Sequence, residues 1–158
     1  LSLLTSFPEL QLFSLALGST PDITHLAEVP KLEILHLVWV RKLSSLAVLA
    51  SCTSLRILSV DSMANVESLP SLASLTRLES VELDTLKGLT DLSGVAAAPA
   101  LKRLTVAGTP KLDAEAFRCL VGHPTLTELR IYPSLGGAGL KKPVLEVVQR
   151  LLPGVLRA

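Results

Sequence analysis

The hydrophobic positions along the chain repeat one short pattern. Pro30 is followed by Leu32, Leu35 and Leu37, and this P/T-x-L-x-x-L-x-L pattern occurs six times if Phe, Val and Ile are allowed for Leu. The pattern starts at Pro8, Pro30, Thr53, Thr76, Pro99 and Pro124, so successive starts are 22, 23, 23, 23 and 25 residues apart. Self-similarity at this period is typical of a solenoid made of stacked repeats.

Each match predicts a short strand followed by a path back to the next strand. Side chains around the last two apolar positions alternate inward and outward, which is the period of a strand. The inward trios are Leu10, Phe13 and Leu15; Leu32, Leu35 and Leu37; Leu55, Leu58 and Val60; Leu78, Val81 and Leu83; Leu101, Leu104 and Val106; and Leu126, Leu129 and Ile131. A second apolar set with a spacing of three, such as Leu43, Leu46 and Leu49, suits a short 3₁₀ or irregular return. The repeats are therefore stable only when stacked, because one repeat cannot bury its own apolar face.

The two ends of the array have different signals. The fifth return path predicts a helix over 113–121, with Asp113 as N-cap and Gly122 as C-cap. After the sixth strand the pattern ends, and 134–158 is expected to form a C-terminal cap, with a loop over 134–140 and a helix from Pro143 to about Leu152. The first residues resemble the tail of an earlier repeat, which predicts an N-terminally truncated fragment of a longer protein.

Composition limits the classes of protein to consider. At 158 residues, one domain spanning 1–158 is expected, and no apolar run approaches the roughly 20 residues that span a bilayer. The net charge of +1 and the 3% of aromatic residues argue against a nucleic-acid surface. We also expect no insertion into a membrane. Cys52 and Cys119 are expected to be reduced core thiols, since both fall in return segments and have no metal-ligand spacing around them.

These repeats resemble the leucine-rich repeat family from about Leu3 to Leu140. The stretches Gly88–Gly94 (GLTDLSG) and Pro21–Thr24 (PDIT) are similar to the turn regions of bacterial internalin-like repeats, while the predicted helix over 113–121 is closer to longer, helix-containing repeats. The resemblance implies an α/β solenoid: a right-handed superhelix of six to seven repeats with a concave parallel β-sheet and a C-terminal capping helix. It also implies protein recognition as the usual task.

The chain departs from the family at one position. Three residues beyond the last strand leucine, where the family usually has Asn or Cys, the chain has Gly18, Val40, Met63, Leu86 and Thr109. A ladder of asparagine side chains is therefore excluded. The backbone of the bend must be satisfied by water, by Ser or Thr hydroxyls, or by direct bonds between repeats.

The outward strand positions form the candidate binding surface. Its N-terminal half is apolar with one histidine, and its C-terminal half is charged and mixed. The predicted partner-binding residues are Leu12, Leu17, Ile34, His36, Val38, Trp39, Ile57, Asp61, Glu82, Asp84, Arg103, Glu128, Arg130 and Tyr132. We expect Trp39 and its aliphatic neighbours to anchor a protein partner and the charged half to set orientation. The alternative is that another domain, a missing N-terminal region or a second copy covers the apolar half, and that the acidic trio Asp61, Glu82 and Asp84 is simply solvated.

No pattern for catalysis is present. The three histidines do not converge with a cysteine on one outward column, and no G-x-S-x-G elbow occurs. The stretch Gly136–Gly139 before Lys141 lacks the G-K-[ST] of a phosphate loop, so a flexible connector is the simpler interpretation. We therefore expect a non-enzymatic protein–protein interaction module with no cofactor and no metal. The alternative is the recognition arm of a larger multidomain enzyme, effector or receptor; the compartment stays open, with the cytoplasm slightly favoured, because a signal peptide could precede Leu1.

Overall fold

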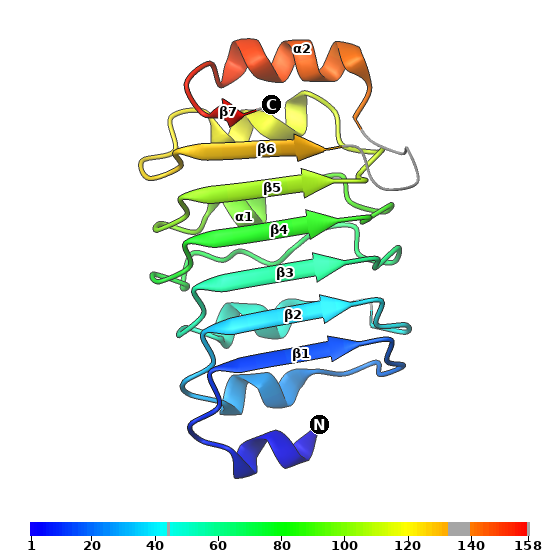
Figure 1. The fold of residues 1–158 in the computed structure, drawn as a ribbon, viewed down its shortest axis with the longest axis vertical. Coiled ribbons are helices and arrows are strands. Elements are labelled where there is room, and N and C mark those ends of the chain that lie inside the picture. Colours follow the sequence, from blue (N-terminus) through cyan, green and yellow to red (C-terminus); the bar gives the residue numbers. More distant parts are fainter. Residues whose placement is uncertain (44, 133–139, 158) are drawn as a thin grey trace.

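The fold is one parallel β-sheet whose strands follow each other in chain order. The structure is a computed structural model that describes residues 1–43, 45–132 and 140–157. The strands are β1 (Leu12–Ala16), β2 (Ile34–Val38), β3 (Ile57–Asp61), β4 (Ser80–Asp84), β5 (Arg103–Ala107), β6 (Glu128–Tyr132) and β7 (Leu156–Arg157). Figure 1 shows them stacked along the long axis of the molecule. The six predicted strands are confirmed, whereas β7 was not predicted.

The strands pair without any shift between equivalent repeat positions. Leu35 of β2 lies beside Leu58 of β3, and Val81 of β4 lies beside Leu104 of β5. Because the register is constant, each inward residue stacks on its equivalent in the next repeat. The inward side chains of the central repeats are almost fully buried and form one continuous core.

Short helical segments return the chain behind the sheet in most repeats (Figure 1). They are η1 (Ser2–Ser6), η2 (Thr24–Glu28), η3 (Ala47–Ser51), α1 (Ser93–Ala96) and η4 (Glu115–Leu120), where η denotes a 3₁₀ helix. The predicted 3₁₀ character is thus confirmed at η3, whereas the expectation for the return between β4 and β5 is wrong in type, because that return contains the four-residue α-helix α1. The helix expected over 113–121 is wrong in type and length: η4 is a six-residue 3₁₀ segment. Its buried residues Phe117 and Leu120 are three apart, the spacing that falls on one side of a 3₁₀ helix.

The return between β3 and β4 contains no helix and packs closely on the next repeat. Leu72 donates its N–H to the carbonyl of Gly94 at 2.9 Å, and Thr90 donates to Glu67 at 3.1 Å. A Cβ added to Gly94 would lie 2.3 Å from the carbonyl oxygen of Leu69. Glycine is therefore needed here because the two backbones touch.

The bends after the strands are held by backbone bonds between repeats, one of the three routes that the sequence left open. The N–H of Leu17 donates to Val38 at 2.9 Å, and the same bond recurs from Trp39 to Asp61 and in the next two repeats. The position of the usual asparagine is instead filled by buried side chains such as Val40, Met63 and Leu86.

The two ends of the stack are finished differently. At the C-terminal end, helix α2 (Lys142–Leu151), with Pro143 in its first turn, packs over the stack and buries Val148. Strand β7 then pairs with β6, Leu129 lying beside Leu156. At the N-terminal end, β1 is the first strand of the sheet, so Phe13 and Leu15 are only half-buried rather than core residues as expected.

Candidate functional site

The outward strand residues form columns that run across the sheet, as the repeat spacing predicts. One column joins Leu12, Ile34, Ile57, Ser80, Arg103 and Glu128; the next joins Ser14, His36, Ser59, Glu82, Thr105 and Arg130; the third joins Ala16, Val38, Asp61, Asp84, Ala107 and Tyr132. The structure therefore brings the predicted site residues onto one surface, which we call the outward sheet face. Leu17 and Trp39 follow directly after β1 and β2, at the margin of this face.

The first three repeats present an apolar patch on the outward sheet face. Leu12 is 52% exposed, Trp39 is 55% exposed and Leu17 is 68% exposed, while Ile57 continues the patch onto β3. Ile34 and Val38 lie between them and are half-buried. Exposed large apolar side chains on adjacent strands are unusual for a surface that meets only water.

Trp39 is fixed at the end of β2 by its backbone. Its φ of 49° lies in the left-handed region, which bulky residues seldom adopt, and its N–H donates to the carbonyl of Asp61 at 2.9 Å. The indole borders a hollow of about 320 Å³ that is also lined by Ser62, Ala64, Thr85 and Lys87. The residue thus combines a rigid backbone with an accessible ring.

Two aspartates lie side by side at the centre of the face. Asp61 and Asp84 are register partners on β3 and β4, and each accepts a hydrogen bond at 2.8 Å from the hydroxyl of the next residue, Ser62 or Thr85. Glu82 is exposed one column away. Within the described part of the chain, none of these three carboxylates has an ion-pair partner. This centre is therefore negatively charged.

The charged half at β5 and β6 is partly neutralised by its own residues. Arg130 Nε donates to Glu128 Oε1 at 2.8 Å, and this hydrogen bond, with the carboxylate charge, raises the pKa of Arg130. Arg103 and Tyr132 remain exposed beside the pair. The two opposite charges thus largely cancel at this place on the face.

The candidate groups for chemistry are separated from each other. His36 is half-buried on the face, whereas His123 is structural: its Nδ1 accepts the N–H of Leu126 at 3.2 Å and its Nε2 faces the carbonyl of Ala98 at 3.1 Å. Burial raises the pKa of Cys52 to about 11. Cys119 is exposed, so the expectation of a core thiol there was wrong. It lies on the outer side of η4, away from buried Phe117 and Leu120.

Neither a metal cluster nor a membrane helix occurs in the described chain. In residues 1–43, 45–132 and 140–157, no three His, Cys, Asp or Glu side chains are arranged to hold a metal ion. The helices of that same part are too short or too polar to cross a bilayer. The glycine-rich stretch considered for phosphate binding lies outside the described residues.

The strand-start side of the sheet carries an ion-pair ladder that the sequence reading missed. Glu33, Arg56, Glu79 and Lys102 precede successive strands, and their side chains meet at 3.5 Å, 3.3 Å and 2.8 Å. Arg77 adds a contact to Glu33 at 3.5 Å. In the sequence, acidic and basic residues alternate here at steps of 23 residues, and this alternation could have predicted the ladder.

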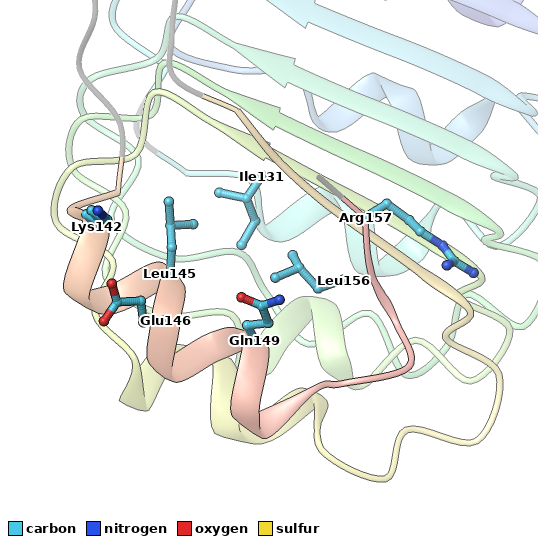
Figure 2. A pocket seen from close by; sticks show the side chains of 7 residues that line it. All are labelled: Ile131, Lys142, Leu145, Glu146, Gln149, Leu156 and Arg157. Atoms are coloured by element: carbon cyan, nitrogen blue, oxygen red, sulfur yellow. The ribbon is translucent and has the colours of Figure 1, made fainter.

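A second depression lies under helix α2 at the C-terminal end (Figure 2). It measures about 320 Å³ and is lined by the apolar residues Ile131, Leu145 and Leu156 and by the polar residues Lys142, Glu146, Gln149 and Arg157. The four polar residues are all exposed. These four side chains are therefore accessible to solvent where they line the depression.

Solved structures that superpose on this chain identify its fold. Internalin C2 from Listeria monocytogenes superposes with a TM-score of 0.59 and 22% sequence identity, over 82% of this chain and 54% of that one. The fold is that of a leucine-rich repeat protein. A second Listeria monocytogenes internalin (inlF) superposes with a TM-score of 0.52 and 20% identity, over 99% of this chain and 49% of that one.

The leucine-rich repeat fold thus confirms the predicted fold class and the resemblance to internalin-like repeats. The chain spans about half the length of these two internalins. No protein-family model matches the sequence, and no curated protein matches it.

Proposed function

We propose that this leucine-rich repeat chain is a non-enzymatic protein-binding module that holds a partner against its concave, outward sheet face. The exposed apolar patch of Leu12, Leu17, Trp39 and Ile57 is the observation that carries the proposal. Large exposed aromatic and aliphatic residues on a rigid surface are typical anchors of protein interfaces. The charged residues at β4 to β6 set the orientation of the partner.

A photo-cross-linking experiment identifies what touches the face. The photoreactive amino acid p-benzoylphenylalanine replaces Ile34 on the face or, as a control, Arg118, which is exposed in η4 behind the sheet. We expect a specific adduct in the native cells at position 34 and not at position 118. The purified adduct protein is then the ligand for quantitative binding.

In that binding assay, Trp39→Ala is expected to weaken affinity at least about tenfold, because an aromatic anchor of an interface contributes more than about 1.4 kcal/mol. Arg130→Glu should also weaken binding. Val121→Ala is the matched control, since Val121 is 52% exposed but lies at the end of η4. Wild-type affinity in both Trp39→Ala and Arg130→Glu would contradict the proposal.

A further inference from the structure

The side of the sheet where the strands end carries basic residues that have no acidic partner. We call it the turn edge: residues 17–20, 39–43, 62–65, 85–88 and 108–112, beyond the arrowheads of β1 to β5 in Figure 1. Arg41, Lys42, Lys87 and Lys111 are all exposed there. These five stretches contain no Asp or Glu. None of the four cations takes part in an ion pair within the described chain.

On the opposite side of the same sheet, where the strands begin, basic residues do have acidic partners. There, Lys31 pairs with Glu9 at 2.6 Å, and Lys102 pairs with Glu79 at 2.8 Å. Arg56 is shared between Glu33 and Glu79. The basic residues just before the strands are thus neutralised and those just after the strands are not, although the whole chain has a net charge of only +1.

The turn edge is also held in a fixed shape by its backbone. The N–H of Arg41 donates to the carbonyl of Gly18 at 2.9 Å, and Ser19 and Arg41 form a parallel bridge. Lys42 adopts a left-handed φ of 69°. Because these backbones are already ordered, a ligand that contacts their side chains does not have to order the loop.

Trp39 gives this cationic edge an apolar centre. Its hollow of about 320 Å³ includes Lys87, and a smaller one joins it to Leu17 and Arg41. An apolar side chain seated against the indole would therefore have cationic groups on both sides. The complementary ligand carries carboxylates that flank a large apolar residue.

We propose that the turn edge binds an acidic segment of a partner protein, with an aromatic or aliphatic side chain against Trp39 and carboxylates at Arg41, Lys42 and Lys87. This inference rests on the proposed function and names the chemistry of its partner. A protein segment suits the edge better than a nucleic acid does. Asp61 and Asp84 end the strands directly beside it and repel a phosphate backbone, which carries a charge at every nucleotide, whereas a peptide can place its few carboxylates opposite the cations alone. Trp39 is also the only aromatic residue in the five stretches, so they offer no row of rings for bases to stack on.

The test uses the whole chain and a displayed library of random twelve-residue peptides. We expect the enriched peptides to have an excess of Asp and Glu around a large apolar residue. Their affinity, measured by fluorescence anisotropy, should fall at least tenfold in the Lys42→Glu/Lys87→Glu variant and fall steeply with added salt. Arg150→Glu, which reverses an exposed cation on α2, is the control and should bind like wild type.

Three results would overturn the inference. The first is that no acidic peptide is enriched. The second is that affinity is unchanged both in Lys42→Glu/Lys87→Glu and in a second double variant, Lys87→Glu/Lys111→Glu. The third is that a 20-nucleotide DNA strand binds more tightly than the best peptide. Circular dichroism confirms that each variant is folded. If charge reversal has no effect but Trp39→Ala still weakens the cross-linked partner, only the acidic-segment inference fails. If neither Trp39→Ala nor Arg130→Glu changes the affinity for the cross-linked partner, the proposed function fails with it.

Discussion

At the scale of single residues, the least predictable feature is the left-handed turn after each strand. Leu17, Trp39, Ser62 and Thr85 have φ values of 49° to 57°, and only the equivalent Gly108 is the residue type that this conformation favours. Residue type alone therefore predicts no such turn in four of the five repeats. The conformation is maintained because the N–H of each of the four donates to a carbonyl of the next repeat, a contact that exists only in the stack.

The glycines show the same dependence on neighbouring repeats and give a direct stability test. Gly94→Ala is expected to destabilise the fold by about 1–3 kcal/mol, because the new Cβ meets the backbone of Leu69 and Pro70, which cannot rotate away. Gly18→Ala is the matched control. Its Cβ would meet Leu15 Cδ1 at an ordinary 3.5 Å, and the lower entropy of the unfolded chain should add about 0.4–1 kcal/mol. Urea unfolding measures both, and equal stability of the two variants would show that the close backbone contact at Gly94 is wrong.

At the scale of elements, the strands could be predicted well and the return segments only in part. A strand needs only alternation around two apolar positions, which the six matches supply. The type of return depends on the space that the next repeat leaves. Segment η4 is a 3₁₀ segment rather than the expected helix, and the return between β3 and β4 forms no helix and packs against Gly94. Strand β7 was missed because Leu156 and Arg157 are too short a stretch to show a period.

The ion-pair ladder between elements predicts a loss of stability in acid. A hydrogen bond from Lys102, followed by its charge and by contacts of Arg56, lowers the pKa of Glu79. Because the folded pKa lies below the unfolded value of about 4.3, the stabilisation is complete above about pH 5 and is lost as the pH falls through the folded pKa. The stability difference between wild type and Glu79→Gln should therefore be larger at pH 7 than at pH 3.

Thermal unfolding across that pH range provides the measurement. Glu67→Gln is the control, because Glu67 is exposed and forms no ion pair in the described chain. Its stability difference from wild type should not follow the same profile. A Glu79→Gln difference that stays constant from pH 7 to pH 3 would show that the ladder does not hold this carboxylate ionised.

At the scale of the whole molecule, the outward sheet face could be predicted because the same pattern recurs in every repeat, so that equivalent positions pair in the sheet. The spacing of 23 residues that relates Ile34 to Ile57 also relates Val38 to Asp61, and the structure pairs both. The sorting of charge between the two sides of the sheet could not be seen in the same way. It depends on which charged side chains form ion pairs between neighbouring repeats. Arg56 and Glu79 form such a pair, whereas Lys87 forms none in the described chain.

The two proposed binding surfaces share Trp39, which lies where the apolar patch of the outward sheet face meets the cationic turn edge. A partner that uses both would place an apolar group at this junction and extend over β1 to β4. The face behind the sheet, with η2, η3 and α1, would remain in contact with solvent.

Methyl-group NMR of the chain with and without the cross-linked partner tests this account most directly. We predict that the shifted methyl signals are those of Leu12, Leu17, Ile34, Val38 and Ile57, while Val121 and Val147, exposed in other parts of the molecule, stay unchanged. Shifts confined to Val121, Val147 or the depression under α2, with the methyl groups of the outward sheet face unaffected, would contradict it.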